Sequence, residues 1–175
     1  STIGMDGKII AADLFTQFTN ALPEMKFIID QDLIGQMWEN RPAPVLSTAF
    51  LLDIRYTGKS VKDKISTVRE ILKEKHADAT VIGALEDVCY LFNIRGNDIA
   101  CTPVVTAYTI VDMQSARLYI DARQMTDAVR TALEQEGVSV LPYEAVFDDA
   151  AKLTGTVYID PARTNIFLRN KISAS

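Results

Sequence analysis

The stretch LEDVCYLFNIRGNDIACTP, residues 85–103, decides how the rest of this 175-residue chain is organised. Its first half places apolar side chains at i, i+3, i+4 and i+7, the spacing of one face of an amphipathic helix: Leu85, Val88, Cys89 and Phe92. Asn93 and Gly96 both tolerate positive φ, so we expect the helix to end there. The stretch therefore predicts a helix, a polar loop and then a strand.

The predicted loop, residues 93–98, is a candidate functional site because of its chemistry. It places Asn93, Arg95 and Asp98 around one glycine, between two apolar elements. Loops that carry so many hydrogen-bonding groups often bind substrates. A structural alternative stays open at this point, in which Arg95 pairs with Asp98 inside the loop and Asn93 caps the helix.

The composition is that of an ordinary globular chain. Apolar residues make up 48% and charged residues 23%, and the length suits one domain, or one domain and a fragment. The formal net charge is −5. An acidic chain without clustered Lys and Arg is not expected to bind nucleic acid as its main partner.

Residue patterns for catalysis or metal binding are absent from the sequence. The one histidine, His76, is expected near the end of a charged helix, where a cation is stabilising. Adjacent acids such as Glu86 and Asp87 point about 100° apart on a helix and do not readily share a metal. The two cysteines have no metal-binding spacing, and Cys89 is expected to be a buried free thiol. We therefore expect no catalytic residue and no metal or other cofactor site in this chain.

The first 40 residues are predicted to form a small β-α-β-α fragment. Its expected elements are a strand at Lys8–Ile10, a helix at Ala11–Leu22, a strand at Lys26–Asp30 and a short helix at Asp32–Trp38. This fragment has too little apolar surface for a core of its own. Two prolines within Arg41–Pro44 force extended backbone, which is typical of a linker.

The remainder alternates strands and helices, with one internal hairpin. The expected elements are a buried strand at Ala49–Ile54, a helix at Val61–His76, a strand at Thr80–Ile82, a strand pair at Val104–Val111 and Arg117–Ile120, a helix from Thr126 to Gly137, a strand at Val138–Leu141, a helix at Tyr143–Leu153 and a strand at Val157–Ile159. We interpret Asn170–Ser175 as a trailing end. This order predicts an α/β fold with a mixed β-sheet flanked by helices on both faces.

The central stretch resembles the LDDIAWLxNxRGxDIxxNPVF signature of X-prolyl aminopeptidases (aminopeptidase P) of the long, three-domain form. The matching residues are Leu85, Asp87, Tyr90, Leu91, Asn93, Arg95, Gly96, Asp98, Ile99, Pro103 and Val104. Trp38–Pro42 resembles the family's W-x-D/N-R-P linker. Tyr56–Ser60, followed by Lys64 and Arg69, resembles its Y-x-G-x-S…K…R segment.

The resemblance implies three parts for this chain. Residues 1–40 would be the C-terminal part of a first N-terminal domain, residues 41–46 a proline-containing linker, and residues 47–175 a creatinase-like second domain. The family's catalytic pita-bread domain has no counterpart in the sequence. Its metal ligands match nothing here, so none is assigned to this chain.

The resemblance also implies a function for the parent protein. Such an enzyme releases the N-terminal residue from peptides with proline in second position, and its catalytic domain holds a divalent metal pair, manganese or zinc. The present region would shape the substrate entrance and support assembly. In the wider family a turn matching Tyr90, Leu91 and Gly96 lies towards the active site, often across a dimer. Tyr90 therefore joins Asn93, Arg95 and Asp98 as a substrate-cleft candidate, and the Arg95 guanidinium suits a peptide carboxylate or carbonyl.

The implied partners are an Xaa-Pro peptide, the parent's own catalytic domain and a second copy in a homodimer. No signal peptide opens the chain, and no apolar run approaches the roughly 20 residues of a membrane span, so a cytoplasmic setting without membrane contact is expected.

Two alternative functions remain for this chain. One is a peptide- or protein-binding module of a pita-bread relative that has lost catalysis. The other is an architectural domain that only supports dimerisation.

Overall fold

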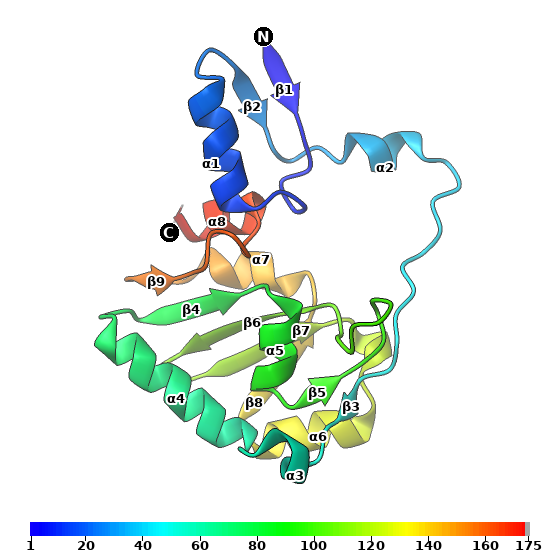
Figure 1. Ribbon diagram of the computed structural model, residues 1–175, viewed down its shortest axis with the longest axis vertical. Helices are drawn as coiled ribbons and strands as arrows, with labels where there is room; N and C mark the ends of the chain where they lie inside the picture. The colour runs from blue at the N-terminus through cyan, green and yellow to red at the C-terminus, as the bar shows by residue number, and fades with distance from the viewer. Residues whose placement is uncertain (174–175) are drawn as a thin grey trace.

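A five-stranded mixed sheet forms the centre of the computed structural model, which describes residues 1–173 (Figure 1). Its strands are β4 (Ala79–Ile82), β6 (Ala107–Asp112), β7 (Ala116–Ile120), β8 (Val138–Pro142) and β9 (Val157–Tyr158), in the order β8-β7-β6-β4-β9. β6 pairs antiparallel with β4 and β7, whereas β8 and β9 add parallel strands at the two edges. The predicted hairpin and the mixed sheet are confirmed.

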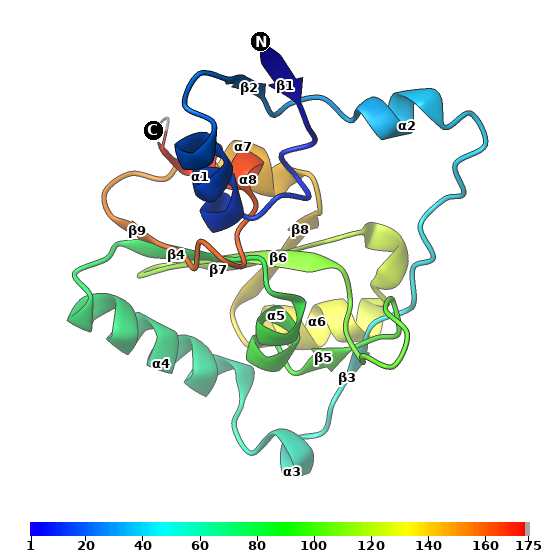
Figure 2. The same ribbon diagram turned by 45° about the horizontal axis from the view of Figure 1, so that its top comes forward.

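Helices cover both faces of this sheet, as Figure 2 shows. On one face lie α4 (Val61–Glu74), α5 (Leu85–Leu91) and α6 (Asp127–Gln135), and on the other lie α7 (Ala145–Ala150) and α8 (Ile166–Ser173). Each face has its own apolar cluster. Val88, Phe92 and Leu133 belong to the first cluster, and Val146 and Tyr119 to the second. The predicted fold class is therefore confirmed.

Side-chain caps explain where two of these helices start. The Ser60 hydroxyl accepts a hydrogen bond from the Asp63 N–H (3.0 Å), and the Thr126 hydroxyl accepts one from the Val129 N–H (3.2 Å). Each bond satisfies an N–H that the first helical turn leaves without a partner. Gly137 follows α6 at φ +84°, as predicted for a residue that ends a helix.

The N-terminal residues form a separate small unit that lies against the C-terminal helix. β1 (Thr2–Gly4) and β2 (Lys26–Ile28) pair in parallel, joined through α1 (Ala12–Ala21), and α2 (Leu33–Met37) follows. Backbone hydrogen bonds from Ala12 N to Thr164 O (2.9 Å) and from Ile166 N to Ile10 O (2.8 Å) join this unit to residues 161–167. α1 and α8 accordingly lie side by side in both views (Figures 1 and 2).

The strand predicted at Lys8–Ile10 is wrong. The first strand, β1, lies earlier, and the Lys8 N–H is instead bound by the Asp6 carboxylate (2.8 Å) in a turn. The apolar pair Ile9–Ile10 suggested a strand, but it has no strand partner in the structure. The Ile10 carbonyl accepts a hydrogen bond from the Ile166 N–H of α8, and Ile9 is 78% exposed.

The buried strand predicted at Ala49–Ile54 is also wrong. Only β3 (Phe50–Leu51) is a strand, and it pairs antiparallel with the equally short β5 (Ile94–Arg95), outside the main sheet. Both of its side chains are exposed by more than two fifths. A four-residue helix, α3 (Ile54–Thr57), follows, because the Asp53 carboxylate caps the Arg55 N–H (2.9 Å).

Two predicted ends differ from the structure. α4 stops at Glu74, two residues before the expected His76, which lies outside the helix at φ +53°. Residues 170–173 belong to α8, so their interpretation as a trailing end is wrong. Residues 174 and 175 lie outside the described part of the chain.

Candidate functional site

The site predicted from the central stretch is built on α5. Val88, Cys89 and Phe92 are buried in the first core cluster, which fixes this short helix against the sheet. Asn93 then leaves the helix at φ +54°, as its residue type predicts. The helix end is therefore a rigid base for the residues that follow it.

Asn93 and Tyr90 meet at a third residue, Lys64 of α4. The Lys64 ammonium donates to the Asn93 Oδ1 (2.6 Å) and to the Tyr90 carbonyl (2.7 Å), and it lies 3.7 Å from the centre of the Tyr90 ring. The Asn93 Nδ2 in turn donates to the Lys59 carbonyl (2.9 Å). Asn93 is buried, whereas the Tyr90 side chain is 57% exposed. The cluster thus holds one exposed aromatic ring in a fixed position.

Lys64 is a buried cation without a carboxylate partner among residues 1–173. Burial lowers its pKa, and the nearby positive charges of Arg95 and Lys59 lower it further. Two carbonyl oxygens and an aromatic face stabilise the charge that remains.

Arg95 lies in β5 and points back to the end of α5. Its Nη1 donates to the carbonyls of Cys89 (2.9 Å) and Ile94 (2.8 Å). A cation at the carboxyl end of a helix compensates carbonyl groups that have no partner within the helix. Within the described chain Arg95 makes no ion pair with Asp98, so the expected alternative of an internal Arg95–Asp98 pair is wrong.

Asp98 connects three distant parts of the domain. Its Oδ1 accepts from the Ser47 N–H (2.8 Å) and hydroxyl (2.7 Å), and its Oδ2 accepts from the Thr106 N–H (2.7 Å). The Gln124 amide, in a 3₁₀ turn at Ala122–Gln124, donates to both oxygens (3.0 and 2.8 Å). Burial raises the pKa of Asp98, but these hydrogen bonds outweigh it and hold that pKa below its usual range.

Gly96 serves this loop in a different way from the one predicted. Its φ is not positive; instead, a side chain there would overlap the Val105 methyl Cγ1 and lie 2.7 Å from the Ser47 hydroxyl. The glycine is therefore required because the chain passes close to its neighbours.

Cys89 is buried, as predicted. Its sulfur accepts a hydrogen bond from the Val105 N–H (3.4 Å), and burial raises the pKa of its thiol.

A cavity of about 380 Å³ opens beside Tyr90, between α4, α5, β4 and the segment after β9. Of the four residues proposed from the sequence, only Tyr90 lines it.

Lys64 also lines this cavity but was not among the site residues predicted from the sequence, although a signal existed. Lys64 is three residues after Val61 and four before Val68, so it lies on the apolar stripe of its helix, where a lysine is unusual.

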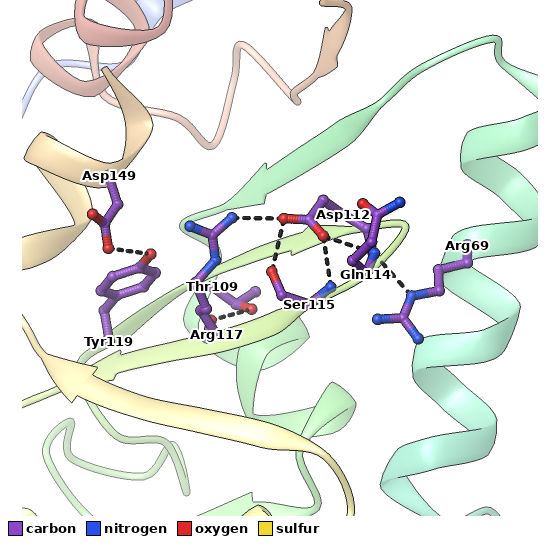
Figure 3. Close-up of polar contacts among 8 residues, drawn as sticks. All are labelled: Arg69, Thr109, Asp112, Gln114, Ser115, Arg117, Tyr119 and Asp149. Carbon is purple, nitrogen blue, oxygen red and sulfur yellow. Dashed lines mark hydrogen bonds and ion pairs between the residues drawn. The ribbon is translucent and has the colours of Figure 1, made fainter. Parts of the chain in front are cut away.

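A second polar cluster lies at the β6–β7 hairpin (Figure 3). The Asp112 carboxylate accepts from the Ser115 N–H (2.6 Å) and hydroxyl (2.7 Å) and from the Arg117 Nη2 (2.8 Å), and the Arg69 Nε donates to the Asp112 carbonyl (2.9 Å). These bonds close the hairpin turn and attach it to α4. Their partners are all within the fold, so we interpret this cluster as structural.

The residues that the structure describes include no group of three or more His, Cys, Asp or Glu side chains placed to hold a metal ion. Among the helices of residues 1–173, none has the length and apolar character needed to cross a membrane.

Comparison with known proteins places these features in a family. The sequence profile of the Creatinase/Prolidase N-terminal domain matches residues 40–175. A probable Xaa-Pro aminopeptidase P from Laccaria bicolor is 38% identical over 162 residues, which is 90% of this chain and 25% of that protein. Aminopeptidase P1 from Arabidopsis thaliana is 33% identical over 156 residues, or 87% of this chain and 24% of that protein. The chain thus spans about a quarter of the length of the curated relatives it matches.

Among solved structures, the chain is similar to X-prolyl aminopeptidase from Caenorhabditis elegans, described as a cytosolic enzyme with a di-nuclear active site. The TM-score is 0.87 at 29% identity, and the similarity covers 96% of this chain and 29% of that one.

Proposed function

Because the chain belongs to the creatinase/prolidase N-terminal domain family, we propose that it is the non-catalytic N-terminal region of an Xaa-Pro aminopeptidase. The parent would be a metallopeptidase that releases the N-terminal residue from peptides with proline in second position. The observation that carries this proposal is the similarity of 96% of the chain to just 29% of an X-prolyl aminopeptidase. That proportion fits one region of a larger enzyme.

The metal pair of such an enzyme, manganese or zinc, would be held outside the present residues. The described side chains do not fit a metal centre, so no step of catalysis is assigned to them. The partners of this region would then be its own catalytic domain, the peptide substrate and a second copy of the protein. A cytoplasmic setting, like that described for the relative from Caenorhabditis elegans, is part of the proposal.

Within this enzyme the α5 region would shape the substrate entrance. Tyr90 is suited to contact a peptide, because its ring is exposed, lines the cavity and is fixed by Lys64. Asn93, Arg95 and Asp98 would act by positioning, because their hydrogen bonds go to neighbouring parts of the domain. All four substrate-cleft candidates thus keep a role, one by contact and three by support.

The proposal is tested by adding an Xaa-Pro tripeptide and manganese to the 175-residue chain and to the protein extended beyond Ser175. We expect no product from the chain alone, since the described residues hold no metal site, and release of the N-terminal residue by the extended protein. An extended protein that binds the tripeptide but never cleaves it would contradict the proposal. It would favour the catalytically dead binding module instead.

Arg95→Ala is expected to lower the free energy of unfolding by about 2 kcal/mol, because two charge-assisted hydrogen bonds to carbonyls are lost. In the extended protein, kcat/KM per folded molecule should fall by less than about tenfold, as expected for a positioning role. Denaturant unfolding and steady-state kinetics measure the two effects. Arg55→Ala, at an exposed arginine of α3, is the control. Unchanged stability with a kcat/KM loss of about 10–100-fold would place the guanidinium on the substrate instead.

We also propose that residues 1–40 end a preceding domain, residues 41–46 are a linker, and residues 47–175 form the creatinase-like domain. Both apolar clusters of the sheet consist of residues from Ala49 onward, which supports this division. The bonds from residues 7–13 to residues 161–167 would then be contacts between neighbouring domains.

A chain that starts at Val45 should therefore still unfold in one cooperative transition, at a lower denaturant midpoint because it lacks those contacts. Circular dichroism in urea measures this. A broad, non-cooperative transition would show that the first 40 residues share the core.

A further inference from the structure

Two positive charges, those of Lys59 and Lys64, line the cavity beside Tyr90. Arg95 does not line it, but its charge, like that of Lys59, acts on the Lys64 ammonium. None of the three makes an ion pair with a carboxylate within the described residues. Like charges held together without counter-charges attract an anion.

The three cations differ in whether their hydrogen-bond donors are already used within the fold. Lys64 uses its ammonium on two carbonyl oxygens and the Tyr90 ring, and Arg95 uses its Nη1 on α5. The Lys59 side chain is exposed at the rim of the cavity and has no hydrogen-bond partner among residues 1–173. Lys59 is therefore the donor available to a ligand, and the other two supply the surrounding positive potential.

The remaining wall of the cavity is mostly apolar. Val68, Val81, Ile82 and Leu91 line it, as do two exposed tyrosines, Tyr90 and Tyr158. Its polar lining outside the cations consists of three threonines and the carboxylates of Asp87 and Asp160. A volume of about 380 Å³ is within the range of small-ligand sites and holds a few side chains.

Arg163 also lines the cavity, but its Nη1 lies 3.7 Å from a Glu86 oxygen and 3.9 Å from an Asp87 oxygen, so its charge is compensated. The Asp160 carboxylate accepts the Ala162 N–H (3.0 Å). Among the cations that line the cavity, Lys59 is therefore the exposed one that has no carboxylate partner within residues 1–173.

We propose that this cavity binds the carboxyl-terminal residue of a short peptide, with its carboxylate at Lys59 and its apolar side chain against Val68, Val81 and Ile82. The inference rests on the proposed function only in taking the ligand to be a peptide. It adds a recognition element for the end of the peptide that lies farthest from the scissile bond. The domain would then favour short peptides with a free, apolar carboxyl-terminal residue.

The test is a titration of the 175-residue chain with the tripeptide Ala-Pro-Leu. Calorimetry measures the affinity, and NMR chemical-shift changes show whether residues lining the cavity respond. The free acid should bind, and its carboxyl-terminal amide should bind about tenfold more weakly, because it lacks the charge that faces Lys59. Lys59→Gln should weaken binding of the acid by a similar factor. Lys62→Gln removes an equally exposed charge outside the cavity and should change the affinity less than twofold.

Three results would overturn the inference: no binding of the acid, equal binding of acid and amide, or equal affinities of the two lysine variants. Hexanoate is the further probe. If it binds as tightly as the tripeptide, the site recognises apolar carboxylates in general, and the assignment to a peptide is wrong. The titration involves no turnover, so its failure leaves the proposed function intact. Conversely, an inactive extended protein would leave a positive titration intact.

Discussion

Replacing Asp98 with alanine is expected to lower the free energy of unfolding by about 3 kcal/mol or more. The substitution removes the acceptor for the Ser47 N–H and hydroxyl, the Thr106 N–H and the Gln124 amide. Gln124 is fully buried, so its amide would lose a partner that water does not easily replace. Urea unfolding followed by circular dichroism measures the loss. Asp148→Ala, at an exposed acid of α7, should cost less than about 0.5 kcal/mol.

The hydrogen bonds to Asp98 also predict that the free energy of unfolding depends on pH. Because the folded state lowers the pKa of Asp98, its stabilisation is complete above the usual aspartate value and is lost as the pH falls through the lower folded value. The free energy of unfolding should therefore decline as the pH falls below about 4. Asp98→Asn, which cannot ionise, should show a shallower decline. Identical slopes for the two proteins would show that Asp98 is not the titrating group.

Replacing Gly96 with alanine is the second large expected effect. The added methyl group would overlap a Val105 methyl group and press on the Ser47 hydroxyl, which also accepts the Asn97 N–H (2.6 Å). Overpacking of a closed site costs about 1–3 kcal/mol, and we expect the upper end because the Asp98 network shares Ser47. Urea unfolding again gives the magnitude.

Gly137→Ala is the matched control for this substitution. No atom lies within 4 Å of the added group, but φ is +84°, so only backbone strain of about 1 kcal/mol is expected. Equal losses for the two variants would show that close packing is not what requires glycine at position 96.

The sequence predicted the regular parts of the fold because their signals are local. The apolar spacing of α5, the serine cap of α4 and the glycine after α6 each act within a few residues. The mixed sheet followed from the alternation of such elements. β3 failed because its apolar residues pair only with β5 and remain exposed, which no local pattern reveals.

The sequence predicted where most of the candidate residues lie in the fold, but not which groups they bond. Asn93 and Asp98 lie outside helices and strands, as predicted, whereas Arg95, expected in the same loop, belongs to β5. Asn93 and Asp98 have partners far away in the sequence, such as Lys64 and Gln124. Spacing between neighbours cannot indicate such contacts. Arg95 was expected to face either Asp98 or a substrate, but it caps α5, because the end of a helix offers carbonyl oxygens within its reach.

The closure of residues 7–12 onto residues 161–167 bears on how the protein is made. Gly7, Ile10 and Ala12 have their backbone partners in the last part of the chain, at Phe167, Ile166 and Thr164. At about 5–20 residues per second, a ribosome needs roughly 8–30 s to synthesise the residues between them. During that interval the amino-terminal strand and helix have left the exit tunnel without the surface on which they rest. Chaperones that bind nascent chains would therefore meet this segment without its partner surface until residues 161–167 have been synthesised.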